Sequence, residues 1–155
     1  MRTVLKAGLL CGVCDIAAAF VVYGITPGIS PIPLLQGIAA GLLGPAAAHG
    51  GLLSAGIGLA CHFFIALTWA AVFTGLNRRL PILAQRAIIT GPIFGVFVYF
   101  FMQRVVVPLS RARRPAFSIR FMIIGCLIHI CCVGLPIALT VRRAMLSERL
   151  ARTGT

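Results

Sequence analysis

Apolar residues occupy most of the chain in long runs, and charged residues fall largely between those runs. A helix needs about 20 apolar residues to cross the hydrocarbon core of a bilayer, and four runs approach or exceed that length. They are residues 7–25, 51–76, 87–109 and 117–141. The pattern therefore predicts an all-α polytopic membrane protein, in which residues 1–155 form a single membrane domain with four transmembrane helices.

The segment between the first two predicted spans, residues 26–50, contains no Lys, Arg, Asp or Glu. Pro33 suits the first turn of a helix, and Gly44 followed by Pro45 suits its end, which predicts a short helix over residues 33–44. Leu34, Leu35, Ile38 and Leu42 share one face of this helix. We expect an interfacial or partly re-entrant helix; the alternative is a fifth full span, for which this helix is too short.

The distribution of Lys and Arg predicts the orientation, because cytoplasmic loops carry an excess of these residues. With the N-terminus inside, nine of the fourteen basic residues are cytoplasmic, both termini are cytoplasmic, and the first external loop carries none. A three-span alternative, with residues 87–109 re-entrant, places ten inside and four outside. We prefer four spans because residues 87–102 form an uninterrupted uncharged run.

Five arginines fall on the predicted outer side, against the general rule, and gather around the third loop. We interpret them as candidate contacts for an anion or a lipid headgroup; a solvated loop is the alternative. The basic tail over residues 142–155 is expected to contact the anionic inner leaflet. The five arginines are Arg104, Arg111, Arg113, Arg114 and Arg120.

Composition excludes an ordinary soluble domain, because hydrophobic residues make up 60% of the chain and charged residues only 10%. The net charge of +12 raises the question of nucleic-acid binding. The basic residues flank apolar runs and form no continuous stripe, which favours lipid headgroups over the phosphates of a nucleic acid. We therefore expect membrane lipids as partners and no nucleic acid.

Asp15, His62 and His129 are titratable residues on three different predicted spans. From a rise of about 1.5 Å per residue, they share a level roughly 12–13 Å from the cytoplasmic edge. A charge at this depth is costly and normally faces the bundle interior, and an imidazole beside a carboxylate can relay a proton. The alternatives are that Asp15 hydrogen-bonds one histidine and fixes helix register, or that the three residues do not meet.

Two histidines at one level also raise the hypothesis of bis-histidine haem ligation. Cys11 and Cys14 are close enough on a helix to share a metal with ligands from the fourth span, but buried cysteine more often acts as a small hydrophobe. We therefore expect no cofactor and no metal. The chain contains no phosphate loop, nucleophile elbow or pair of close carboxylates, so we do not expect an enzyme.

Small residues let membrane helices approach each other closely, and each predicted span carries glycines that suit this role. On the first helix Gly8, Gly12 and Asp15 share one face, which places the acidic side chain on a packing face. The glycines expected at helix contacts are Gly8, Gly12, Gly58, Gly91, Gly95 and Gly125.

Three segments of the chain are QGIAAGLLGPAA, GLACHFFIALTWA and HICCVGLPIAL. They resemble sequences of small, uncharacterised four-span inner-membrane proteins of bacteria, and the resemblance covers most of the chain. It implies a location in the bacterial inner (plasma) membrane and four spans, and it implies no activity.

Three hypotheses for function follow from these patterns. The leading one is a non-enzymatic helix bundle that associates with itself, with lipids or with a membrane complex through its glycine faces. The second is a small proton-coupled transporter or channel subunit that uses Asp15, His62 and His129. The third is a haem-bearing electron carrier.

Overall fold

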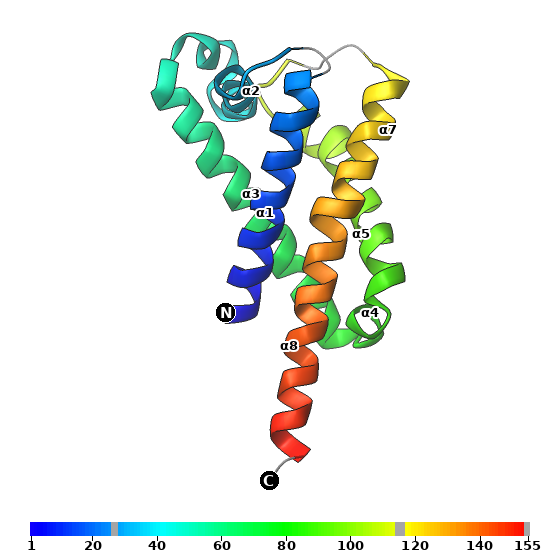
Figure 1. The fold of residues 1–155 in the computed structure, drawn as a ribbon. Coiled ribbons are helices and arrows are strands. Elements are labelled where there is room, and N and C mark those ends of the chain that lie inside the picture. Colours follow the sequence, from blue (N-terminus) through cyan, green and yellow to red (C-terminus); the bar gives the residue numbers. More distant parts are fainter. Residues whose placement is uncertain (26–27, 114–116, 154–155) are drawn as a thin grey trace.

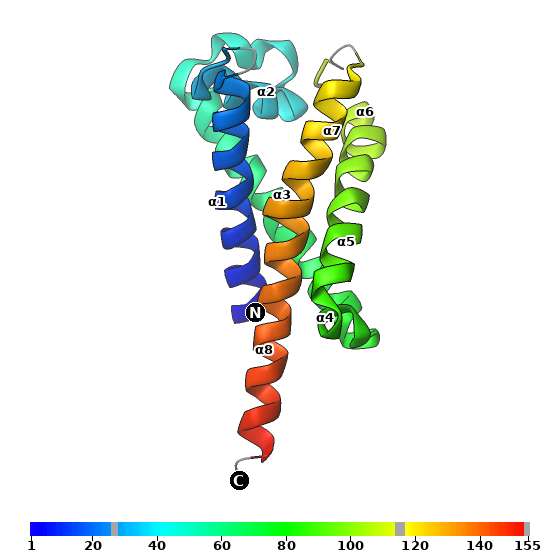
Figure 2. The same ribbon diagram turned by 45° about the vertical axis from the view of Figure 1, so that its right-hand side comes forward.

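The structure, a computed structural model, describes residues 1–25, 28–113 and 117–153. In these ranges every regular element is a helix and none is a strand, which confirms the predicted all-α class. The long helices lie side by side in one bundle (Figure 1, Figure 2). In chain order the elements are α1 (Arg2–Ile25), α2 (Pro31–Leu43), the 3-10 helix η1 (Gly44–His49), α3 (Gly51–Arg79), α4 (Ile82–Gln85), α5 (Ala87–Phe101), the π-helix η2 (Met102–Val106), α6 (Val107–Leu109), α7 (Ile119–Ile128), the π-helix η3 (His129–Gly134) and α8 (Leu135–Thr153).

Within the described ranges, five helical stretches are long and apolar enough to cross a membrane, by length and composition. The chain thus fits a membrane protein with several transmembrane helices. The predicted count of four is not confirmed, because the stretch that contains the expected interfacial helix also meets the requirement. The five stretches are Arg2–Ile25, Pro31–His49, Gly51–Arg79, Ala87–Leu109 and Ile119–Ala151.

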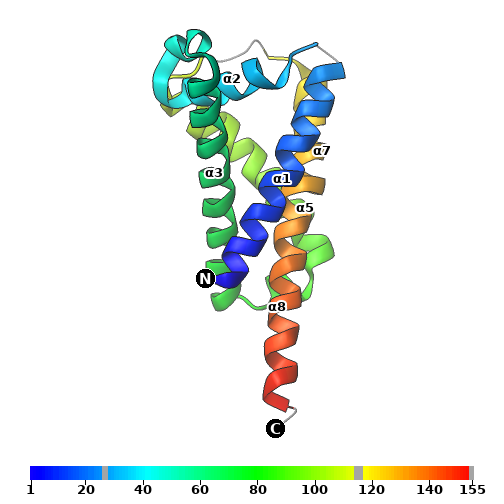
Figure 3. The same cartoon turned by 60° about the vertical axis from the view of Figure 1, so that its left-hand side comes forward.

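α2 lies across one end of the bundle, between the ends of α1 and α3 (Figure 3). Gly44 ends this helix with a φ of 70°, a conformation that glycine adopts without strain. The backbone of α2 reaches two neighbours: Leu35 O lies against Gly58 of α3, and Gly41 O accepts a hydrogen bond of 3.0 Å from Arg111 N. α2 therefore joins α3 to the segment that follows α6.

The helices extend beyond the predicted apolar runs at three places. α1 begins at Arg2 rather than at residue 7, α3 continues to Arg79 rather than to 76, and α8 continues to Thr153, so most of the predicted tail is helical. An apolar run measures the part of a helix that lipid can cover, whereas Arg and Lys are good helix formers that continue the helix past it. Figure 1 shows the end of α8 standing clear of the other helices.

The buried core lies between α1, α3, α5 and the α7–η3–α8 helix. Its largest fully buried side chains are Phe73, Ile137, Val98 and Cys11. Trp69 of α3 stands edge-on to three phenylalanine rings of α5 at centroid distances of 5.9, 5.8 and 5.2 Å. The aromatic contacts hold α3 against α5.

Two glycines set the close approach of α1 to α3. A Cβ added at Gly8 would lie 2.9 Å from Leu67 Cα, and one added at Gly12 would lie 2.8 Å from the Phe63 ring. Real Cβ atoms do not pack this closely, so a larger residue at either position would separate the helices. The glycine face of α1 is therefore in contact with α3.

A second close crossing joins α5 to η3. Gly91 and Gly95 of α5 face the backbone of η3, and Gly134 of η3 faces Gly91 in return. Gly125, one turn before η3, lies against the ring of Tyr99. With Gly58 against α2, all six glycines expected at helix contacts lie where elements of this one chain meet.

Candidate functional site

The contact between α1 and α3 brings Asp15 close to His62. His62 Nδ1 lies 4.0 Å from Asp15 Oδ2, and the side chains of His62 and Asp15 are 12% and 17% exposed. Gly12, which precedes Asp15 by almost one turn, permits this approach because it lets the two helices meet. The pair lies midway along both helices, at an interface between them.

A hydrogen bond to Gly12 fixes which nitrogen of His62 faces Asp15. His62 Nε2 lies 2.9 Å from Gly12 O, and since a carbonyl oxygen only accepts, Nε2 carries the hydrogen and donates it. In the neutral ring Nδ1 is then an acceptor. Two acceptor atoms, His62 Nδ1 and Asp15 Oδ2, therefore face each other, and one proton on either of them turns the approach into an attraction.

The second carboxyl oxygen of Asp15 also lacks a donor. Asp15 Oδ1 is buried and has no hydrogen-bond partner within the described residues. A buried polar atom without a partner costs about 1–3 kcal/mol, and a carboxylate carries this cost together with its charge. The carboxyl group of Asp15 is therefore held in the helix interface with one of its two oxygens unpaired within the described residues.

The contacts of His129 are with Gly125 and Tyr99 rather than with the pair. Its Nδ1 is 2.9 Å from Gly125 O in its own helix, and its ring stands edge-on to Tyr99 of α5 at a centroid distance of 5.4 Å. Over the described residues, no ion-pair distance links His129 to Asp15. The structure thus shows a pair of titratable groups and a separate histidine, where the sequence suggested three groups at one level.

The histidine contacts bear on the haem hypothesis. His62 Nε2 lies within hydrogen-bond distance of Gly12 O, so axial ligation through this atom would require the contact to open. His129 contacts Gly125 O through Nδ1, and this contact does not involve its Nε2. In the part of the chain that the structure describes, no group of three or more His, Cys, Asp or Glu residues could hold a metal ion.

The cysteines are free thiols, and Cys11 belongs to the helix interface. Its thiol lies 3.4 Å from Gly8 O and 3.9 Å from Ala66 O, so it donates weakly to carbonyls of both α1 and α3. Cys14 is half-buried on the adjoining part of α1. The CGVCD segment therefore contributes a packing residue, Cys11, and an ionisable residue, Asp15.

The predicted outer arginines do not share one environment. The four of them that the structure describes, Arg104, Arg111, Arg113 and Arg120, are all exposed, and Arg111 is in addition tied to α2 through its backbone. Arg114 lies outside the described residues. Arg104 lines a cavity of about 440 Å³ between the end of α1, the α5–η2–α6 helix and the start of α7.

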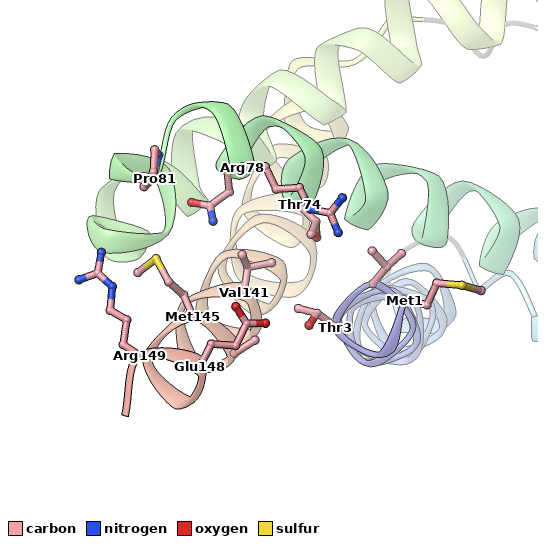
Figure 4. Close-up of a pocket in the computed structure, with 12 residues that line it drawn as sticks. Met1, Thr3, Thr74, Arg78, Pro81, Val141, Met145, Glu148 and Arg149 are labelled. Carbon is pink, nitrogen blue, oxygen red and sulfur yellow. The ribbon is translucent and has the colours of Figure 1, made fainter. Parts of the chain in front are cut away.

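A second cavity, of about 500 Å³, lies near the opposite end of the bundle between α1, α3 and α8. Figure 4 shows Thr3 of α1 and Glu148 of α8 on facing sides of it, with Arg78 on the neighbouring α3. Glu148 is, with Asp15, one of the two acidic residues of the chain. This cavity is distinct from the Asp15–His62 pair. Val4 of α1 lines the cavity, and Asp15 lies eleven positions further along the same helix.

Two features of the site were not predicted from the sequence. The acceptor that orients His62 is the carbonyl of Gly12, and a backbone acceptor on another helix leaves no mark in the sequence. Gly134, the counterpart of Gly91 and Gly95, is visible as a glycine in the fourth span, but its role depends on the π-helical turn of η3, which local sequence does not specify.

No protein-family model, no curated protein and no solved structure matches the chain. The resemblance of three segments to bacterial inner-membrane proteins stays a prediction. The Asp15–His62 pair is therefore the feature of the molecule that bears most directly on its function.

Proposed function

We propose that the protein is a non-enzymatic integral membrane protein whose Asp15–His62 pair binds and releases a proton, as in a small proton-coupled transporter or channel subunit. The observation that carries this proposal is the 4.0 Å approach of His62 Nδ1 to Asp15 Oδ2. Both atoms are acceptors in the arrangement described above, so one proton has two neighbouring sites. Ionisable groups within membrane helices commonly mark ion and proton pathways.

A packed layer separates the pair from the 500 Å³ cavity. Ala7 and Cys11 of α1 and Ala70 of α3 have no exposed surface, and Gly8 of α1 lies against Leu67 of α3. Close packing of this kind leaves no room for a continuous file of water along the interface. We therefore propose a gated proton pathway, in which a proton reaches the pair from one side at a time, rather than an open channel.

We also propose four spans in the bacterial inner membrane, with both termini cytoplasmic. The position of α2 across one end of the bundle supports an interfacial rather than a spanning role for this helix (Figure 3). The excess of Lys and Arg near the termini supports a cytoplasmic N-terminus. In this arrangement the α2 end of the bundle faces the outside.

The structure gives less support than the sequence does to association with another protein through the predicted glycine faces. Those glycines contact neighbours within the chain, whereas Gly56 and Gly75 of α3 have open space where a Cβ would stand. Membrane lipids remain the expected partners of the exposed apolar side chains, such as Leu53 and Phe64 of α3, which are 77% and 71% exposed.

Proton flux into liposomes tests the proposal. Purified protein is reconstituted into vesicles that contain a pH-sensitive dye, and a proton gradient is imposed. Asp15→Asn keeps the size of the side chain but removes the group that exchanges the proton, so flux should fall by at least about tenfold. His129→Gln, which changes a histidine outside the pair, serves as the matched control and should keep the wild-type flux.

Two results would overturn the proposal. One is a wild-type flux no greater than that of protein-free liposomes. The other is an Asp15→Asn variant that is folded and retains the wild-type flux.

A further inference from the structure

The 440 Å³ cavity at the α2 end of the bundle, hereafter the Arg104 cavity, combines apolar walls with a cation. Its walls include the rings of Tyr23 and Phe121, which stack with centroids 5.8 Å apart and planes within 3° of parallel. Its polar lining includes Gln103, Arg104 and Ser118. A concave site with apolar walls and a few polar groups is the usual form of a small-molecule site.

The charge of Arg104 is not balanced by an acidic residue in the cavity. The chain has two acidic residues, Asp15 and Glu148. Asp15 faces His62, and Glu148 lines the cavity near the opposite end. The guanidinium, which stays charged under all ordinary conditions, is therefore the dominant charge of the Arg104 cavity, and this cavity is complementary to an anion.

The start of α7 adds to this complementarity. Ser118, which lines the cavity, is the N-cap residue of α7, and its side chain makes no capping hydrogen bond. The first N–H groups of a helix have no partner within the helix, and together with the helix dipole they favour a negative charge. Arg104 itself lies in the π-helix η2, and π-helical turns are frequent at functional sites.

We propose that the Arg104 cavity binds a phosphate-bearing amphiphile. Its phosphate would pair with Arg104 near the start of α7, and its apolar part would lie along the stacked rings of Tyr23 and Phe121. A guanidinium matches phosphate oxygens in two parallel hydrogen bonds. The source of the phosphate is either a phospholipid of the surrounding membrane or a soluble phosphate, and the experiment below separates the two.

Binding to purified protein in a neutral detergent tests this site. Short-chain phosphatidic acid and inorganic phosphate are titrated separately, and binding is measured by calorimetry. We expect phosphatidic acid to bind and Arg104→Gln to weaken its binding by about tenfold or more, because a charge-assisted contact is lost. Arg120→Gln, which removes an exposed arginine of the same α7 start that does not line the cavity, should bind as the wild type does.

The outcomes are distinct. Phosphatidic acid that binds far more tightly than inorganic phosphate supports the amphiphile, while equal affinity assigns the cavity to soluble phosphate and overturns the role of its apolar wall. An equal loss in Arg104→Gln and Arg120→Gln would show nonspecific attraction and overturn the site. If Arg104→Gln does not fold, Arg104→Lys, which keeps the positive charge, takes its place. A folded lysine variant that fails to bind where the wild type binds would show that the planar guanidinium is essential, and would support the proposed pairing.

Discussion

Single glycines decide how closely the helices of this bundle approach one another. At Gly95 an added Cβ would meet the backbone of His129 and Ile130, whereas at Gly75 it would meet nothing within 4 Å. Both residues lie inside helices, so they differ mainly in their surroundings. Comparing substitutions at Gly95 and Gly75 therefore distinguishes the effect of close packing from the intrinsic effect of glycine on helix stability.

Gly95→Ala is expected to lower the free energy of unfolding by about 1–3 kcal/mol, because backbone atoms of η3 cannot yield as a flexible side chain can. Gly75→Ala should be neutral or stabilising by up to about 1 kcal/mol, because alanine favours a helix more than glycine does. Equilibrium unfolding in mixed micelles measures both. Equal changes in the two variants would contradict the close crossing of α5 and η3.

The residues of the candidate site could be predicted from sequence only in part. The spacing of Gly8, Gly12 and Asp15 places the acidic residue on the glycine face of α1, and the structure brings this face against α3. Counting residues estimates how far along its helix a histidine lies, but it does not show which neighbouring helix the side chain faces. That direction depends on the α5–η3 crossing, which places His129 against Tyr99.

At the scale of elements, helix composition was more predictable than helix placement. The long apolar runs predict four of the five membrane-length helices, and most of the predicted helix ends agree with the structure to within a few residues. A helix that crosses lipid needs an apolar run of this length, so such helices are visible in the sequence. The position of α2 depends on contacts far away in sequence, such as Gly41 O with Arg111 N and Leu35 O with Gly58. Its composition alone is compatible with both an interfacial and a spanning helix.

Labelling of engineered cysteines at the two ends of this element distinguishes these roles. Ser30→Cys lies just before α2, and His49→Cys lies at the last residue of η1. A membrane-impermeant thiol reagent should reach both from the same side if α2 is interfacial. Leu80→Cys, just after α3, is the control and should react only from the other side. Labelling of positions 30 and 49 from opposite sides would instead make α2 a fifth span.

At the scale of the whole molecule, the bundle separates its two acidic residues from each other and from Arg104. Asp15 lies beside His62 midway along the α1–α3 interface, and Glu148 lines the cavity near one end. Arg104 lies near the other end in a cavity without an acidic residue. Ala7 and Cys11, which have no exposed surface, lie along α1 between Asp15 and the Glu148 end.

A double-mutant cycle on proton flux tests the central claim most directly, using Asp15→Asn, His62→Gln and both together. Glutamine keeps an amide donor for Gly12 O but cannot take up the proton. If the two residues act as one proton site, either single variant should reduce flux by at least about tenfold and the double variant should fall no further. Single effects that multiply in the double variant, or a flux unchanged by either substitution in folded protein, would contradict the account.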